Sequence, residues 1–342
     1  MFSLLHIIRR LAGQLRRENL HRVILVLLAL ILVGSAAFWF FEKELGFFDA
    51  FWWSIVTVTT VGYGDISPAT LGGRVVGMLL MMLGIGFLGV FTATIAGIFI
   101  ENKMMENKGM KATTEEGLFV ICGWNYRGPD IVAELRADLK SKDLPIAVIA
   151  EIEEKPLDDP ALHFIHGEVN EETLNKANLN KAQAVILLSE ERLEGKVRDA
   201  KTILDTLTIK SLFPKVYVCV ELMDSKNLEH CRLAKADEII VVGELSTNLL
   251  VQAVLDPGVT QIVTELVSNR YGHELYKVDS PPSLIGRTFF EAMSGLKKKY
   301  DILCLGVEKK TDNKLIANPD ADYILGPEDQ LVVIALERPE LS

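Results

Sequence analysis

The stretch "TTVGYGD", residues 59–65, lies between two long apolar segments, and this position decides the fold expected for the chain. Segment 23–41, "VILVLLALILVGSAAFWFF", and segment 75–100, "VVGMLLMMLGIGFLGVFTATIAGIFI", contain no charged residue. Each is long enough to cross the roughly 30 Å hydrocarbon core, which takes about 20 helical residues. Segment 23–41 is too long for a cleaved signal peptide, and no small-residue cleavage site precedes the next charged stretch. The sequence therefore predicts two membrane-spanning helices.

Basic residues gather at one end of each span. Arginines precede the first span and lysines follow the second, whereas the segment between them has only Lys43 and Arg74. This asymmetry predicts a multi-pass protein of the inner (plasma) membrane with both termini in the cytoplasm. Residues 1–22 alternate apolar and basic side chains, which predicts either a cytoplasmic helix along the membrane surface or a simple topogenic flank. The flanking basic residues are Arg9, Arg10, Arg16, Arg17, Arg22, Lys103, Lys108 and Lys111.

Residues 48–59, "FDAFWWSIVTVT", are mostly apolar and aromatic but too short to cross the membrane. A segment of this length with Trp52 and Trp53 is typical of a re-entrant helix, which enters the membrane and stops. Non-helical backbone at membrane depth is stable only where protein or water satisfies its polar groups. Residues 59–65 are therefore expected to line a water-filled path.

An ion that crosses hydrocarbon must exchange its hydration shell for other oxygen atoms, and consecutive backbone carbonyl groups can supply them. Successive carbonyls point the same way only if alternate residues adopt dihedrals that a Cβ disfavours, and Gly62 and Gly64 relieve this strain. Thr60 adds a hydroxyl oxygen, whereas the side chains of Val61 and Tyr63 are expected to point away from the axis. A chance glycine turn is the alternative, and the position between a re-entrant helix and a second span argues against it.

The hexapeptide "TVGYGD", residues 60–65, resembles the selectivity filter of potassium channels. The resemblance implies K+ as the permeant ion, held at Thr60 to Tyr63, with Gly64 and Asp65 completing the filter. One chain carries one such loop and cannot surround an ion, so a homotetramer embedded in membrane lipid is expected. No arginine-rich helix precedes the spans in this sequence, so voltage sensing by gating charges has no support.

The second span is expected to line the pore as its inner helix, and residues 23–100 form the expected pore domain. Gly84, Gly86 and Gly89 lie in this span, and glycine permits bending or close packing of a helix. Potassium channels bend this helix near such a glycine, so the resemblance implies a gating hinge at Gly84 or Gly86. Packing against a neighbouring helix is the alternative role of the same glycines.

Composition indicates a short membrane part joined to a larger cytosolic part. The 342-residue chain has a mean hydropathy of +0.24, yet 24% of its residues are charged. A formal net charge of −10 argues against nucleic acid as a partner, because a phosphate backbone requires a basic surface. The four cysteines are far apart without a CxxC pair, which predicts buried reduced thiols rather than a disulfide framework or a zinc site.

Residues 101–116, "ENKMMENKGMKATTEE", are polar without apolar periodicity and are expected to form a linker. Beyond them, short apolar runs recur with helix-like stretches between most of them. Strands that alternate with helices predict a parallel sheet with crossover helices, here a Rossmann-like α/β domain over residues 117–243. The predicted strands are 118–122, 145–150, 161–165, 183–188, 216–221 and 238–242.

The turn after the first predicted strand, "GWNYRG", fits the dinucleotide-binding pattern G-x-G-x-x-G except that Asn125 replaces the second glycine. Glu151 ends the second strand, where such folds place an acid for ribose hydroxyl groups. A site for NAD or an adenine nucleotide and a purely structural turn both remain open. The candidate nucleotide-binding residues are Gly123, Asn125, Tyr126, Arg127, Gly128, Glu151, Gly167 and Glu168.

The order of pore, linker and Rossmann-like domain resembles the RCK family, the regulators of potassium conductance. The segments "VICGW" at 120–124 and "LEHCRLAKADEIIV" at 228–241 carry this resemblance, with a small α+β lobe expected at 273–342. The family implies crossover and dimerisation helices at 244–272 and an octameric gating ring. Four of the eight domains would belong to the channel chains, and the hypothetical source of the other four is an internal start at Met104, Met105 or Met110.

Calcium is the best-known RCK ligand, but the positions that match its carboxylate ligands are Leu188, Glu221 and Met223, of which only one is acidic. Because Ca²⁺ takes about six to eight oxygen ligands, the usual RCK calcium site is expected to be lost, while a divalent cation elsewhere stays open. His163 and His166 lie three apart on a predicted strand and face opposite sides, which argues against a shared metal.

The favoured function is a ligand-gated potassium channel. In it, a gating ring that binds a nucleotide, or a divalent cation as second candidate, moves the inner helices and opens the pore. A membrane-tethered NAD-dependent dehydrogenase is the enzymatic alternative, but the sequence has no convincing catalytic acid, base or substrate domain, so no enzyme activity is expected. A non-conducting nucleotide sensor is the third candidate, and nothing in an intact filter motif favours it.

Overall fold

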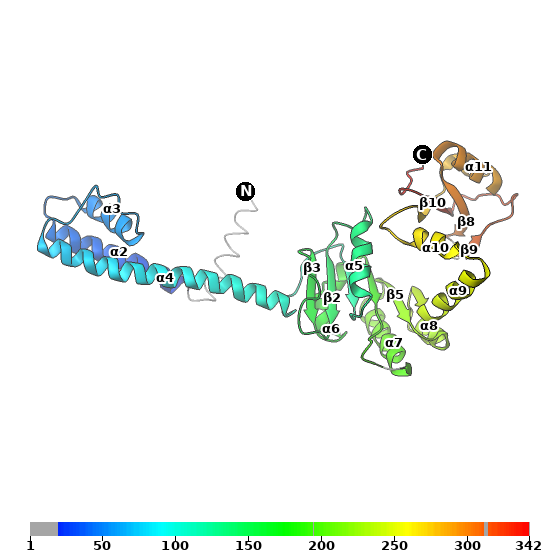
Figure 1. Ribbon diagram of the computed structural model, residues 1–342, viewed down its shortest axis with the longest axis horizontal. Helices are drawn as coiled ribbons and strands as arrows, with labels where there is room; N and C mark the ends of the chain where they lie inside the picture. The colour runs from blue at the N-terminus through cyan, green and yellow to red at the C-terminus, as the bar shows by residue number, and fades with distance from the viewer. Residues whose placement is uncertain (1–19, 194, 311–313, 342) are drawn as a thin grey trace. The chain divides into compact units, whose positions relative to one another are not determined.

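A computed structural model describes residues 20–193, 195–310 and 314–341 (Figure 1). The chain divides into two compact units, the membrane unit Met1–Met105 and the α/β unit Glu106–Ser342. Residues 1–19 lie outside the described part, and so does most of the helix expected over residues 1–22.

The described part of the membrane unit contains three helices: α2 (Leu20–Phe41), α3 (Phe47–Val58) and α4 (Leu71–Asn107). α2 and α4 both contain stretches that are long and apolar enough to cross a membrane. α3 has 12 residues, too few to cross, and Trp53 within it stacks on Phe38 of α2 with 3.7 Å between ring centroids. The two predicted spans and the short aromatic helix between them are confirmed.

Small residues allow α2 and α4 to pack closely. Gly34 of α2 lies against Leu80 of α4, and Gly72 at the start of α4 lies against Phe41 at the end of α2. The order of these two contacts makes the helices antiparallel. An added Cβ would lie 2.6 Å from a methyl carbon of Leu80 at Gly34 and 2.3 Å from the Phe41 ring at Gly72, so larger side chains would separate the helices.

A buried carboxylate joins the end of α2 to the start of α4. Glu42 is 7% exposed and accepts hydrogen bonds from the backbone N–H (2.9 Å) and the hydroxyl (3.0 Å) of Thr70. Thr70 in turn caps α4, because its hydroxyl accepts a hydrogen bond from the N–H of Gly73 at 3.0 Å. The Thr70 end of the segment between α3 and α4 is therefore hydrogen-bonded to the end of α2 and to the start of α4.

The linker expected over residues 101–116 begins later than predicted, because α4 continues to Asn107. Residues 101–107 are Glu, Asn, Lys, Met, Met, Glu and Asn, and most of these residue types favour helix. Apolar periodicity marks only those helix faces that pack against a partner, so its absence did not mark the end of the helix.

The chain after α4 is an ordered strap on the α/β unit. The carbonyl of Gly109 accepts a hydrogen bond from the N–H of His166 at 3.0 Å, and the N–H of Thr113 donates to the carbonyl of Lys176 at 2.8 Å. Gly109 has a φ of +67°, and a Cβ there would lie 2.3 Å from the His166 nitrogen. The strap therefore requires glycine at this position and is held along the edge of the sheet within the α/β unit.

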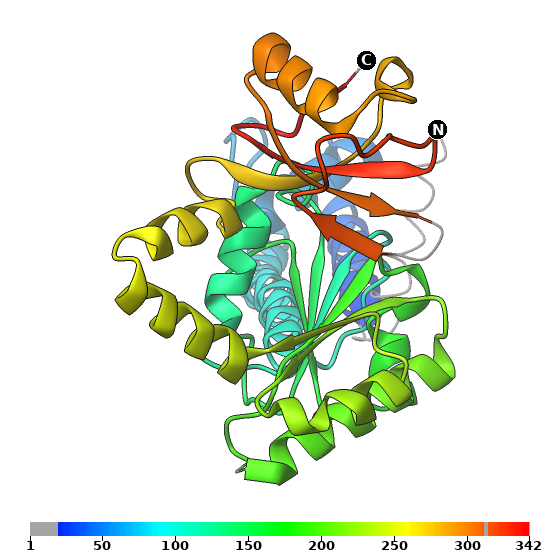
Figure 2. The same cartoon turned by 90° about the vertical axis from the view of Figure 1, so that its right-hand side faces the viewer.

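A six-stranded parallel sheet forms the centre of the α/β unit (Figure 2), and the six predicted strands are confirmed. Its order is β3-β2-β1-β4-β5-β6. α5 (Gly128–Ala137) packs on one face, and α6 (Glu171–Lys176), α7 (Gly195–Leu212) and α8 (Leu228–Leu233) pack on the other. The strands are β1 (Phe119–Cys122), β2 (Ile146–Ala150), β3 (Leu162–His166), β4 (Ala184–Leu187), β5 (Tyr217–Leu222) and β6 (Glu238–Val241).

The strand order places the nucleotide candidates at one edge. β1 pairs with β2 on one side and with β4 on the other, as in the register Val120 to Ala147 and Val120 to Val185. The chain order therefore reverses at β1, and in open parallel sheets ligands bind in the crevice that such a reversal leaves at the carboxyl ends of the strands. The turn that follows β1 lies at this crevice.

A helical hairpin joins this sheet to a second lobe. It consists of α9 (Val242–Leu255) and α10 (Val259–Val267). The second lobe is an antiparallel sheet of order β7-β10-β8-β9 with α11 (Phe289–Tyr300) on one face (Figure 2), as expected for a small α+β lobe. Its strands are β7 (Glu274–Asp279), β8 (Leu303–Lys309), β9 (Lys314–Ala317) and β10 (Asp329–Ala335), and short 3₁₀ helices lie at Leu179–Lys181, Ser225–Asn227 and Pro282–Leu284.

The four cysteines are free thiols. Cys122, Cys231 and Cys304 are buried and Cys219 is half-buried. Burial raises the pKa of Cys231 and of Cys304 to about 11, so both stay protonated near neutral pH and are poor nucleophiles or metal ligands.

Candidate functional site: the filter loop and the sheet edge

Residues 59–65, the filter loop, leave α3 with an alternating backbone. The φ angle is +62° at Thr60, +56° at Gly62 and +75° at Gly64, and it is not positive at Val61 or Tyr63 between them. Alternation between the left-handed and right-handed regions turns successive carbonyl groups to one side of the chain. Glycine adopts a positive φ freely, whereas at Thr60 the same conformation costs about 1–2 kcal/mol, a strain that its residue type does not reveal.

Trp52 of α3 holds the filter loop through its side chain. Its indole Nε1–H donates to Asp65 Oδ2 at 2.9 Å, and its ring stacks on Tyr63 with 5.9 Å between centroids. The backbone N–H of Val61 also donates to the carbonyl of Val56 in α3 at 3.0 Å. Tyr63 thus packs against α3 as expected, whereas Trp52 was not among the predicted site residues. Its signal in the sequence is an indole donor 13 residues before an aspartate.

Replacing Trp52 with phenylalanine is expected to shorten channel openings. Trp52→Phe keeps a ring beside Tyr63 but removes the donor to Asp65. One hydrogen bond to a charged group contributes about 1.5–3 kcal/mol, so entry into a non-conducting filter should become at least about tenfold faster. Single-channel recording measures this, with Trp39→Phe on the exposed side of α2 as the control. Unchanged open times in Trp52→Phe would show that this bond does not hold the loop.

The glycines of α4 have different surroundings. Gly84 is buried, and a Cβ there would lie 3.1 Å from Val58 of α3, whereas a Cβ at Gly86 or Gly89 would have no described atom within 4 Å. Packing is thus the better account of Gly84, and Gly86 remains the hinge candidate. The face of α4 that carries Gly89 forms a hollow together with Thr60. The α4 residues that line it are Ile85, Leu88, Gly89, Thr92, Ala93 and Ala96.

The turn Gly123–Gly128 joins β1 to α5. Gly123 has a φ of +83°, and a Cβ there would lie 2.7 Å from the carbonyl oxygen of Leu188. A Cβ at Gly128 would lie 2.7 Å from the Trp124 ring. Packing therefore requires both outer glycines of the fingerprint whether or not a ligand binds, and the purely structural role of the turn stays open.

Asn125, which replaces the middle glycine, points into the protein. It is 6% exposed, and its Nδ2 donates to the carbonyl of Ser189 (3.0 Å) and to Glu221 Oε2 (3.2 Å). Its Oδ1 accepts a hydrogen bond from the N–H of Arg127 at 2.9 Å. Asn125 thus joins the turn after β1 to β4 and β5, a role that its spacing in the sequence does not indicate.

The carboxylates nearest the expected calcium position are already engaged. Glu221 accepts hydrogen bonds from the N–H (2.9 Å) and the hydroxyl (3.1 Å) of Ser189 and forms an ion pair with Arg127. Asp199 of α7 is 1% exposed and accepts from the N–H groups of Met223 and Asp224, both at 3.0 Å. Among the described residues, no group of three or more His, Cys, Asp or Glu is arranged to hold a metal ion.

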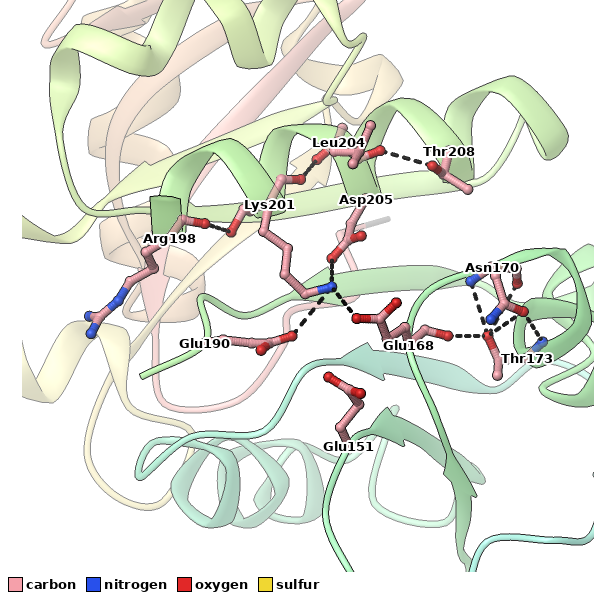
Figure 3. Close-up of polar contacts among 12 residues, drawn as sticks. Glu151, Glu168, Asn170, Thr173, Glu190, Arg198, Lys201, Leu204, Asp205 and Thr208 are labelled. Atoms are coloured by element: carbon pink, nitrogen blue, oxygen red, sulfur yellow. Dashed lines mark hydrogen bonds and ion pairs between the residues drawn. The ribbon is translucent and has the colours of Figure 1, made fainter. Parts of the chain in front are cut away.

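Acidic residues follow β2, β3 and β4 at the carboxyl edge of the sheet (Figure 3). Glu168 follows β3 and Glu190 follows β4, and Lys201 of α7 extends its ammonium group between them. The distances from Lys201 Nζ are 3.5 Å to Glu190 and 3.7 Å each to Glu168 and Asp205. Sequence reasoning missed Lys201 and Asp205, whose signal is a Lys–Asp pair four residues apart on the helix after β4.

Glu151, which follows β2, points toward the same group of side chains (Figure 3). It pairs with Arg192 Nη2 at 3.1 Å, and Arg192 also lies 3.4 Å from Glu190. Gly167 precedes Glu168 with a φ of +136°. The structure thus brings the predicted Glu151, Gly167 and Glu168 to one edge with the turn after β1, although Lys201 and Arg192 already engage both acids.

Family models match three successive parts of the chain. A model described as "Ion channel" matches residues 25–101, one described as "TrkA-N domain" matches 119–242, and one described as "Castor and Pollux, part of voltage-gated ion channel" matches 243–340. The chain is 29% identical to the "Calcium-gated potassium channel TvoK" of Thermoplasma volcanium over 96% of its own length and 95% of that protein. In sequence the chain is thus similar to potassium channels over nearly its whole length, with a segment that matches the TrkA-N model after the segment that matches the ion-channel model.

Other relatives of the chain are also potassium channels. The chain is 25% identical to "Potassium channel protein 1" of Methanocaldococcus jannaschii over 90% of its own length and 91% of that protein. The solved human SLO3 gating ring matches 64% of the chain with a TM-score of 0.51 and 18% identity, a likeness of fold alone. A structure titled "GsuK channel bound to NAD" matches 94% of the chain with a TM-score of 0.48 and 18% identity. The chain spans 44% and 57% of these two solved chains.

The environment at the acidic edge of the sheet changes the proton affinity of the side chains there. Burial raises the pKa of Asp205 from 3.8 to about 6, Glu190 and Glu168 add to the rise, and Lys201 opposes it. The pKa of Lys201 is also raised: burial lowers it, but Asp205, Glu190 and Glu168 outweigh that effect. The cluster of Glu151, Glu168, Glu190, Asp205, Lys201 and Arg192 carries more negative than positive charge when all six side chains are ionised.

Replacing Asp205 with asparagine is expected to remove a pH-dependent loss of stability. A folded-state pKa of about 6 against 3.8 means that the folded protein keeps a proton that the unfolded chain releases. The free energy of unfolding therefore falls as the pH rises through this window, by at most about 3 kcal/mol. Asparagine resembles the protonated acid, so the stability advantage of Asp205→Asn over the wild type should be small at pH 4.5 and larger at pH 7.5.

Thermal unfolding of the detergent-solubilised channel across this pH range measures the difference. Asp256→Asn, in the exposed turn after α9, provides the matched control and should follow the wild type at every pH. A gap between Asp205→Asn and the wild type that does not grow with pH would contradict the raised pKa.

Proposed function

We propose that four copies of the chain form a potassium-selective pore that ligand binding to the RCK domains opens and closes. The observation that carries the pore is the alternation of positive φ at Thr60, Gly62 and Gly64 in a loop held by α3. Such a backbone lines up the carbonyl oxygens of Thr60, Val61, Gly62 and Tyr63, where they replace the water around K+. One chain supplies one column of oxygens, so a homotetramer in the lipid bilayer is needed to enclose the ion.

Charge placement supports an orientation for the channel. Basic residues gather before segment 23–41 and after segment 75–100, whereas Lys43 and Arg74 alone lie between these two apolar segments. In the inner membrane this distribution favours an orientation with both termini, and with them the RCK domain, in the cytoplasm.

Exposed apolar side chains support assembly of the RCK domains into dimers and an octameric ring. None of the residues of α9 and α10, all of which the structure describes, is buried. Burial against a second copy would stabilise the pair by about 25 cal/mol per Å² of apolar surface. A short C-terminal fragment in purified channel would identify internal starts at Met104, Met105 or Met110 as the source of four further domains. The large exposed apolar residues are Leu245, Leu250, Val251, Val254, Leu255, Ile262 and Val267.

The first candidate for the gating ligand is NAD or an adenine nucleotide. The turn Gly123–Gly128 leads into the N-terminus of α5, and helix N-termini favour phosphate groups. Glu151 follows β2, where an acid binds ribose hydroxyls in this fold. A divalent cation is the second candidate. TvoK is a calcium-gated channel by its name, but Glu221 and Asp199 here accept hydrogen bonds from the chain itself.

Recording from purified channels in planar bilayers tests this function. Potassium-selective current that NAD or ADP alters from the RCK side is expected, because a gating ligand must bind the open and closed states unequally. Absence of current would favour a non-conducting sensor and would overturn the pore assignment. Hydride transfer from NADH by the same preparation would instead support the membrane-tethered dehydrogenase.

A further inference from the structure

Arg127, at the end of the turn after β1, is held across the edge of the sheet. Its guanidinium forms an ion pair with Glu221 of β5, and the two side chains are 24% and 7% exposed. Its Nε–H also donates to the hydroxyl of Tyr126 at 3.0 Å, and its Cζ lies 4.9 Å from the centre of that ring. The cation of the turn is therefore engaged by side chains of the chain itself.

Glu221 is positioned by neutral donors rather than by Arg127. Its Oε2 accepts hydrogen bonds from Ser189 N–H (2.9 Å), Ser189 Oγ (3.1 Å) and Asn125 Nδ2 (3.2 Å). Its Oε1 pairs with Arg127. Asn125, which replaces the middle glycine of the pattern, therefore helps to hold the Glu221 carboxylate where it pairs with Arg127.

A phosphate group at this turn and the Glu221 carboxylate require the same cation. Phosphate in this fold lies at the N-terminus of the helix after β1, here α5, which begins directly after Arg127. Arginine binds a carboxylate and a phosphate through the same N–H groups of its guanidinium. The two anions therefore compete for Arg127. Glu221 therefore competes with the phosphate of the ligand for Arg127.

We propose that Glu221 is an internal competitor that sets the affinity for nucleotide, and that the pyrophosphate of the ligand must take Arg127 from Glu221 in order to bind. The proposal rests on the proposed nucleotide function and adds a residue outside the predicted nucleotide site to it. It also assigns the ligand class, since an uncharged nucleoside such as adenosine offers no anion to exchange for Glu221.

A change of the ion-pair partner of Arg127 can be transmitted to the second lobe through α5. Glu134, two turns along α5, accepts a hydrogen bond from the N–H of Asn269 at 2.7 Å and pairs with Arg270 Nε at 3.0 Å. Asp130, one turn earlier, lies 3.3 Å from Arg270 Nη2. The helix that begins directly after Arg127 therefore also holds the segment that leads into β7.

Calorimetric titration of the detergent-solubilised full channel with NAD tests the competition. Glu221→Gln keeps the side-chain volume and an acceptor for Ser189 but removes the charge, so NAD should bind about tenfold more tightly, the size expected for one charge-assisted hydrogen bond. Arg127→Gln should weaken binding, and the double variant should bind like Arg127→Gln alone. Glu229→Gln, which removes an exposed partner of Arg232, is the matched control and should leave the affinity unchanged.

The outcomes separate this proposal from the proposed function. If folded Glu221→Gln binds NAD no more tightly than the wild type, the competition is overturned and the nucleotide site stands. If the wild type binds neither NAD nor ADP, both are overturned. If Glu221→Gln does not fold, a structure of the wild type with NAD decides: separation of Arg127 from Glu221 supports the competition, and a persistent ion pair overturns it.

Discussion

Replacing Gly62 with alanine is expected to abolish potassium-selective current. Gly62 has a φ of +56°, and an L-residue in this region costs about 1–2 kcal/mol. In the proposed tetramer four chains contribute to one filter, so the total is about 4–8 kcal/mol, which lowers the population of the conducting conformation about a thousandfold or more. Within one chain no described atom lies within 4 Å of the added Cβ, so the expected loss comes from the backbone conformation. Rubidium flux into vesicles and bilayer recording measure the loss.

Two controls isolate the backbone effect. Gly97→Ala, at a helical position of α4 where the added Cβ has no described atom within 4 Å, should retain selectivity. Alanine of D configuration at position 62, introduced by semisynthesis, accepts a positive φ and should also retain it. Selective current in Gly62→Ala would remove the main support for the filter assignment.

Replacing Gly123 with alanine is expected to destabilise the RCK domain and to abolish its response to nucleotide. Besides the φ of +83°, the new Cβ would lie 2.7 Å from the backbone oxygen of Leu188, which cannot move aside without breaking the pairing of β1 with β4. The combined cost of conformation and overpacking is about 2–5 kcal/mol. Thermal unfolding and NAD titration of the purified channel would report it.

Gly295→Ala is the matched control for this substitution. Gly295 lies in α11 with no described atom within 4 Å of an added Cβ, so alanine there should raise stability by about 0.5–1 kcal/mol. The two variants are therefore expected to shift the unfolding temperature in opposite directions. An unfolding temperature of Gly123→Ala equal to that of the wild type would mean that the turn relaxes without cost.

Features with a local period were predictable from the sequence. The uncharged spans, the short aromatic helix and the six apolar strands each follow from residues that are neighbours in the chain. The end of α4 was not predictable in the same way, because residues 101–107 favour helix without an apolar face. Apolar patterning detects burial, and a helix that leaves the membrane into water is not buried.

The partners of the site residues were not predictable, because they lie far apart in the sequence. Asn125 and Glu221 are 96 positions apart, and their contact follows from the pairing of β1 with β4 and of β4 with β5. Lys201 reaches Glu168 and Glu190 only because α7 packs over the carboxyl edge of the sheet. Trp52 reaches Asp65 because the filter loop folds back along α3.

The sequence by itself determined that this chain has two apolar segments of membrane-spanning length, a glycine-alternating loop between them and a Rossmann-like α/β domain, since these depend on segment length, hydropathy and the dihedral freedom of glycine. Only the tertiary structure decided which charges are free to meet a ligand. The ion pair of Arg127 with Glu221 and the engagement of Glu168 by Lys201 arise where strands and helices converge. The strength of a charge depends on the partners that folding places beside it, and residue type alone does not specify those partners.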